Sequence, residues 1–191
     1  TEGGEPTDPT IKKQYEVSLS DSTTGEETLV SITSKQENVA TTTTNDGIEL
    51  DTTVQDEEKS VTTKVKLNQN GTSVITLTKQ DNASGEKQSG AIASFKTDVE
   101  MEIQEDGGVT VTSKETDATT GEQKETKATV KSDGSVEHEV KRVDSSGNEV
   151  TTKATSKAKN STTTILQDGT VQTKAKVKDA ATGEESTISV D

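Results

Sequence analysis

The segment VTTKVKLNQNG, residues 61–71, holds a strand and the turn that ends it. Every second residue from its start is Val61, Thr63, Val65 or Leu67, and the residues between them are Thr or Lys. Alternation with a period of two residues is typical of a β-strand with one modest apolar face. Asn70-Gly71 supplies the positive φ angles that a two-residue hairpin turn requires. The segment therefore predicts a short strand that ends in a tight turn.

The same alternation recurs along the chain, for example in residues 99–103 and 171–177. The chain contains 36 Thr, whose β-branched side chain favours strands, and no segment carries a helical stripe. Counted from turn to turn, the sequence predicts an all-β fold of about 14–15 short strands joined as an antiparallel meander.

Ten glycines are expected at the turns that join these strands. Some close a stretch of Asp, small residues, Gly and Glu, as in DATTGE at Asp117–Glu122, and others follow Asp or Asn directly. An Asp at the start of such a turn caps its own backbone. The structural turn residues are Gly25, Gly47, Gly71, Gly85, Gly107, Gly121, Gly134, Gly147, Gly169 and Gly183.

The spacing of these turns predicts an internal repeat. Gly25 and Gly85 are 60 residues apart, and Gly85 and Gly147 are 62 apart. A weaker turn signal follows the same spacing at Asn38, Asp98 and Asn160. We therefore expect a period near 62 residues. The expected division is a flexible acidic leader at 1–10 and one repetitive β domain at 11–191, with repeats 21–80, 81–143 and 144–191.

The composition limits how thick the fold can be. Hydrophobic residues make up 24% of the 191 residues, aromatic residues 1%, and the net charge is −14. So little apolar surface predicts a thin single-layer sheet or an elongated sandwich rather than a filled barrel. Disorder is the alternative, but a disordered chain has no reason to keep regular turns and alternation. In composition the strands resemble the single-layer sheet of the spirochaete outer surface lipoproteins, without any diagnostic motif.

Several function classes find no support in the sequence. The chain has no Cys, and its lone His138 has no second His or Cys with which to bind a metal. Acidic balance argues against nucleic acid, and no apolar run is long enough to insert into a membrane. Asp-rich turns could bind Ca²⁺ but match no known calcium motif, so capping is the preferred interpretation. We expect no enzyme activity, no cofactor and no catalytic or metal-binding residue.

The remaining features favour a non-enzymatic structural protein that is extracellular or on a cell surface: a stalk, an adhesin segment or a fibre subunit. The alternative is a binding module that recognises a host protein or glycan through a sheet face or edge. A meander leaves two free edge strands, here expected near residues 11–19 and 185–190. Their apolar residues are candidates for self-association into fibres or contact with a surface protein: Tyr15, Val17, Leu19, Ile188 and Val190.

Overall fold

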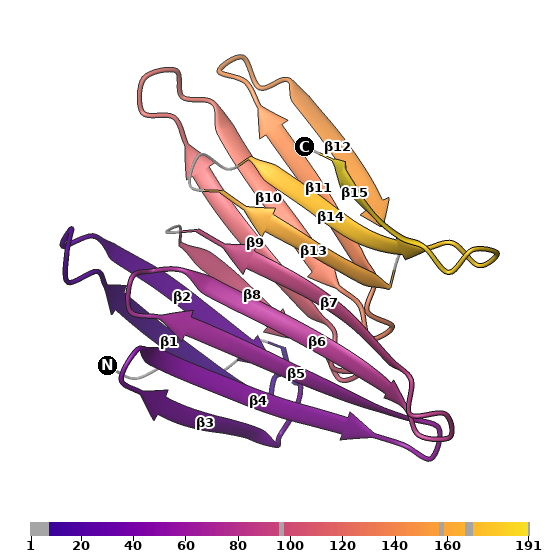
Figure 1. Cartoon of the computed structure of the whole chain (residues 1–191). Coiled ribbons are helices and arrows are strands. Elements are labelled where there is room, and N and C mark those ends of the chain that lie inside the picture. Colours follow the sequence, from indigo (N-terminus) through magenta and orange to yellow (C-terminus); the bar gives the residue numbers. More distant parts are fainter. Residues whose placement is uncertain (1–7, 96–97, 157–158, 167–169, 191) are drawn as a thin grey trace.

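The computed structural model describes residues 8–95, 98–156, 159–166 and 170–190, and it consists of strands, turns and short connections (Figure 1). The all-β prediction is confirmed, and the number of strands agrees with the expected 14–15. The strands are β1 (Lys13–Ser20), β2 (Glu27–Ser34), β3 (Val39–Thr44), β4 (Gly47–Gln55), β5 (Lys59–Asn68), β6 (Ser73–Asp81), β7 (Lys87–Ser94), β8 (Val99–Ile103), β9 (Val109–Thr116), β10 (Gln123–Val130), β11 (Val136–Val143), β12 (Glu149–Ser156), β13 (Asn160–Ile165), β14 (Val171–Lys178) and β15 (Glu185–Val190).

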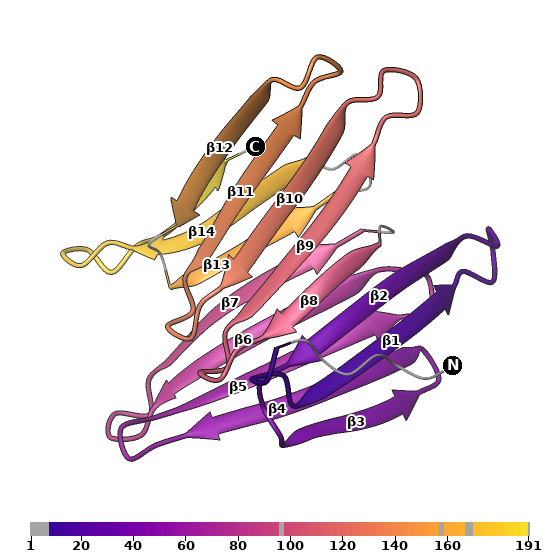
Figure 2. The same cartoon turned by 180° about the vertical axis from the view of Figure 1, so that it is seen from behind.

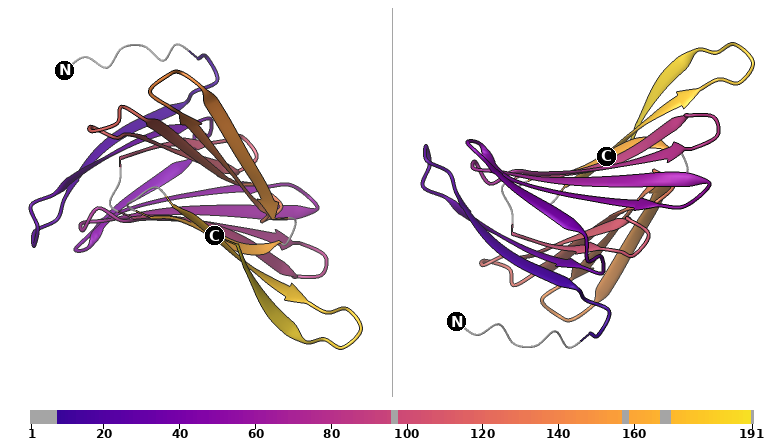
Figure 3. Two further views of the ribbon diagram at one scale, coloured as in Figure 1. Left: turned by 90° about the horizontal axis from the view of Figure 1, so that it is seen from above. Right: turned by 90° about the horizontal axis from the view of Figure 1, so that it is seen from below.

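The strands form two mixed sheets that pack face to face as a sandwich. Sheet A has the order β1-β2-β8-β9-β10-β11-β12, and sheet B has the order β15-β14-β13-β7-β6-β5-β4-β3. Consecutive strands within one sheet pair antiparallel, as in a meander, but β2 pairs with β8 and β7 with β13 in parallel. Figure 3 shows the sheets as two separate layers. Of the two arrangements that the sequence allowed, the sandwich is present and the single layer is wrong.

The sandwich forms because each sheet has an apolar inner face that the other sheet covers. Val65, Ile75 and Ile92 of sheet B are almost fully buried, as are Val111 and Val130 of sheet A. Each face alone would leave these side chains in water, which costs about 25 cal/mol per Å² of apolar surface. Two thin faces together make one continuous core from few apolar residues.

Hydrogen-bonded threonines complete the core where apolar residues are missing. The buried Thr63 hydroxyl of β5 donates to the Gly107 carbonyl of the facing sheet at 2.6 Å. Thr52 of β4 donates to Gln36 Oε1 at 2.6 Å, and the Gln36 amide donates to the Gln104 carbonyl at 3.0 Å. A buried polar group costs free energy unless it has a partner, so these bonds let Thr occupy the interior.

The long turns follow one plan, which DATTGE at Asp117–Glu122 illustrates. The Asp117 carboxylate accepts the N–H groups of Thr119 and Thr120, both at 2.8 Å, and these bonds lower its pKa. Gly121 closes the turn at φ 71°, where its N–H donates to the Asp117 carbonyl. A residue with a Cβ is strained at that angle, so Gly is suited to the position.

The turn at Asn70-Gly71 differs from the expected two-residue hairpin. Asn68 N–H donates to the Thr72 carbonyl at 2.9 Å, and Gly71 N–H donates to the Asn68 carbonyl at 3.0 Å. The loop therefore contains three residues, with Gly71 last at φ 84°. This is the hairpin in which a tight turn is followed by a left-handed residue, a geometry that also matches the twist of the strands.

The weak signal at Asn38, Asp98 and Asn160 lies where the chain changes sheet, rather than at a turn within one. β2 is in sheet A and β3 in sheet B, and the chain returns to sheet A at β8 and to sheet B at β13. Residues 1–7 of the expected leader and the predicted turn at Gly169 lie outside the described residues. The described part of the chain contains no helix that could cross a bilayer.

Candidate assembly interface

Each sheet ends in two edge strands, and these lie in pairs at opposite ends of the sandwich. β1 and β3 form one end, and β12 and β15 form the other (Figures 1 and 2). Edge strands carry a row of backbone N–H and C=O groups that no neighbouring strand pairs, and these groups can template another strand. The ends of the sandwich are therefore its candidate interaction sites.

The two sequence-predicted edges are both sheet edges in the structure. Tyr15, Val17 and Leu19 alternate along β1 on its inner face, opposite Ile32, Val30 and Thr28 of β2. Ile188 of β15 lies opposite Ala175 of β14. The side chain of Val190 lies outside the described residues, although its backbone pairs with Thr173.

The other two edges, β3 and β12, were not anticipated from the sequence. Neither is the first or last strand in chain order, so a simple meander would pair each of them on both sides. β3 has the sequence VATTTT and therefore none of the charged residues or prolines that protect edges from pairing. Since protected edges carry such residues, the sequence Val39–Thr44 gives no signal that would mark it as an edge.

The interior of the sandwich is open at the end formed by β12 and β15. Val150 of β12 is opposite Arg142, and its side chain is 64% exposed although it belongs to the inner face. Ile188 of β15 is 53% exposed. Figure 3 shows the yellow β14–β15 hairpin bending away from sheet A. Apolar side chains at this end thus lack the cover that the core has elsewhere.

The outer faces of both sheets carry ion pairs between neighbouring strands. Lys64 of β5 lies 3.3 Å from Asp51 of β4, and Lys141 of β11 lies 2.8 Å from Glu149 of β12. Such exposed pairs contribute little to stability because water and salt screen them. They do give the faces a hydrated, mixed-charge surface, so the edges are better suited than the faces to bind another chain.

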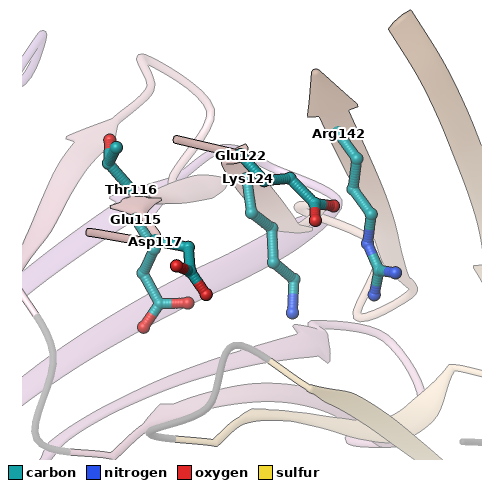
Figure 4. Close-up of a pocket in the computed structure, with 6 residues that line it drawn as sticks. All are labelled: Glu115, Thr116, Asp117, Glu122, Lys124 and Arg142. Carbon is teal, nitrogen blue, oxygen red and sulfur yellow. The ribbon is translucent and has the colours of Figure 1, made fainter. Parts of the chain in front are cut away.

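A surface hollow beside the β9–β10 turn is lined by charged residues (Figure 4). Its volume is about 420 Å³. Glu115, Lys124 and Arg142 come from three neighbouring strands and point to the same side of the sheet. Asp117 caps its own turn, as described above. The hollow contains no aromatic residue that could hold a sugar ring, and its acidic and basic groups offset one another.

His138 lies on the inner face of β11, which it shares with Val136 and Val140. Its Nδ1 is 3.1 Å from the Thr173 hydroxyl of β14, so it bridges the two sheets. Partial burial lowers its pKa by desolvation. Within the described residues, no three His, Asp or Glu side chains gather in a way that could hold a metal ion.

Both parallel junctions inside the sandwich use the same side-chain contact. Asp98, just before β8, accepts the Leu29 N–H of β2 at 2.7 Å. Asn160, at the start of β13, accepts the Ser89 N–H of β7 at 3.0 Å. In each case a short polar side chain at the start of a new strand binds the backbone of the strand with which the new strand pairs in parallel. Comparison with known proteins adds nothing to this geometry, because no family model, curated protein or solved structure matches the chain.

Proposed function

We propose that this protein is a non-enzymatic structural protein of the cell surface or the extracellular space, which acts as a stalk, an adhesin segment or a fibre subunit. The observation that carries the proposal is the way the sandwich extends. Strands are added side by side in five-strand runs, β3–β7 in sheet B and β8–β12 in sheet A, and the changes of sheet before β8 and before β13 use the same parallel junction.

This architecture suits a spacer because its length depends only on the number of runs. The core stays equally thin however many strands are added, and each new strand contacts only its neighbours and the facing sheet. The acidic, Thr-rich exterior and the absence of Cys are compatible with a protein that works outside the cell and stays soluble there.

Lengthening the protein tests the structural role. A second copy of residues 38–159, inserted after Lys159, places each copied strand beside an equivalent neighbour. Strands lie about 4.8 Å apart, so five more strands in each sheet should extend the particle by about 24 Å. A second copy of residues 98–159 alone should extend it by about half as much. Small-angle scattering measures both increments.

A particle that becomes thicker, or one whose insert stays unfolded, would contradict a stalk built by strand addition. The location is tested separately. An antibody raised against the folded protein should label intact source cells or their secreted fibres before permeabilisation. Labelling that appears only after permeabilisation would rule out the surface role.

A further inference from the structure

The internal junctions show what kind of strand each free edge accepts. In both sheets, the strand that follows a change of sheet pairs in parallel with the last strand of the earlier run in that same sheet: β8 with β2, and β13 with β7. β12 is also the last strand of a run, but its outer side is a sheet edge. β3 is the first strand of a run, and its outer side is an edge as well.

The same comparison applies to β15 and β1. β15 follows β14 as the third strand after a change of sheet, the place that β5 and β10 hold in their runs. Those strands pair antiparallel with a fourth strand, β6 or β11. β1 is paired with β2 as β6 is with β7 and β11 with β12, so β1 is a strand of this fourth kind.

We propose that a second copy of this chain docks end to end on the first, with its β3 pairing parallel to β12 and its β1 antiparallel to β15. The second copy would continue sheet A of the first with its own sheet B, and sheet B with its own sheet A. The inference rests on the structural role proposed above and names the partner and the surface. Each added copy again presents a free β12 edge and a free β15 edge, so the contact propagates into a fibre.

The register of the parallel joint follows from the two internal ones. Ser34, Ser94 and Ser156 end equivalent hairpins, so Leu29 and Ser89, five residues earlier, correspond to Thr151. Asn38 precedes β3 as Asp98 precedes β8. In the joint, Asn38 of the second copy accepts the Thr151 N–H, and Val39 lies opposite Thr152.

The register of the antiparallel joint is obtained in the same way. Ile188 pairs with Ala175 as Thr126 pairs with Ser113, and Thr126 pairs with Val140 on its other side. Val140 is the fifth residue of β11, and Val17 is the fifth residue of β1. Ile188 therefore faces Val17 of the second copy, and Thr187 faces Ser18 on the outer side of the sheet.

The chemistry of the two ends agrees with this docking. The joint places the exposed Ile188 against Val17 and extends the facing sheets over Val150, so apolar side chains at the open end gain cover. β3 brings no charge to the joint, and the charged residues of β12 already pair with β11, Lys153 with Glu139 and Glu149 with Lys141. No like charges are forced together.

Disulfide trapping tests both joints, because the native chain has no cysteine. The variants Ser18→Cys and Thr187→Cys should form a mixed dimer when they are combined and oxidised, since directly opposite residues lie within reach of a disulfide. Thr42→Cys and Thr155→Cys, opposite each other in the parallel joint, should do the same. β1 and β15 belong to different sheets at opposite ends, so a bond within one chain does not compete.

Matched controls separate docking from random collision. Each single variant alone, and Thr187→Cys mixed with Thr119→Cys in the exposed β9–β10 turn, should stay monomeric on a non-reducing gel. Adding Ile188→Lys to the Thr187→Cys variant should abolish its mixed dimer with Ser18→Cys, with an unchanged circular dichroism spectrum. Controls that cross-link as well as the mixed pairs would overturn the proposal. Cross-linking at only one of the two joints would overturn it too. If the lengthened proteins extend as expected while no variant cross-links, the structural role stands and end-to-end docking is wrong.

Discussion

Gly90 on β7 marks a close approach between the two sheets, and replacing it with Ala tests their packing. A Cβ added at this position would lie 2.5 Å from Val130 Cγ2 and 2.6 Å from the Gly134 carbonyl oxygen, both on the side of sheet A. The carbonyl belongs to the backbone and cannot rotate away as a flexible side chain does. The sheets would have to separate locally to admit one methyl group.

The expected sign depends on the architecture. On the open face of a single sheet, Ala in place of a strand Gly would stabilise by about 0.5–1 kcal/mol, because it loses less conformational freedom on folding. In the sandwich, overpacking costs about 1–3 kcal/mol and exceeds that gain. With the middle of both ranges, the net loss is about 1 kcal/mol, which corresponds to a decrease in melting temperature of about 2–4 °C for a protein of this size.

Thermal and urea unfolding followed by circular dichroism measure this change. Gly121→Ala is the matched control, because Gly121 has nothing within 4 Å of its added Cβ and is sensitive only to backbone strain at φ +71°. A Gly90→Ala protein that melts at the same or a higher temperature would refute the close packing of β7 on sheet A. A decrease limited to Gly121→Ala would refute it as well.

Two further predictions concern the modular plan and the turns. Deleting residues 81–143 removes β7–β11 and brings β12 into the place of β7, so the ten remaining strands should still give a β spectrum with a lower melting temperature; a random-coil spectrum would show that the runs are not interchangeable. Hydrogen bonds from turn N–H groups lower the pKa of Asp81, Asp117 and Asp179. Their stabilisation is therefore present above about pH 4, the unfolded value, and is lost as the pH falls further. The urea midpoint should decrease below that pH, and less so in Asp117→Asn; an identical acid profile would exclude a contribution from this carboxylate.

Most of the strands and hairpins could be predicted from the sequence because their causes are local. Alternation such as that of Val61–Leu67 sets which side chains share a face, and an Asp that caps a Gly-closed turn sets where the strand reverses. The exact loop could not be predicted as well: Asn70-Gly71 suggested two residues, whereas the hydrogen bonds enclose three. The 62-residue period remains a prediction from spacing.

The candidate interface could be predicted only in part. Free edges at β1 and β15 follow from any meander, and the structure has them. The edges at β3 and β12 depend on where the chain changes sheet. The residues around Asn38 and Asp98 are of the same types as those in a turn. Nothing in them therefore distinguishes a reversal within one sheet from a crossing to the other sheet.

Tertiary structure makes that choice through partners that are distant in the chain. Asp98 is satisfied by the N–H of Leu29, 69 residues away, and Asn160 by that of Ser89, 71 residues away. Every backbone offers the same N–H and C=O groups, so the identity of the neighbouring strand leaves little trace in the residues themselves. The sequence by itself therefore determined the strands, the turns and the thin core. The pairing of distant strands decided that there are two sheets, where they join, and which four edges stay open.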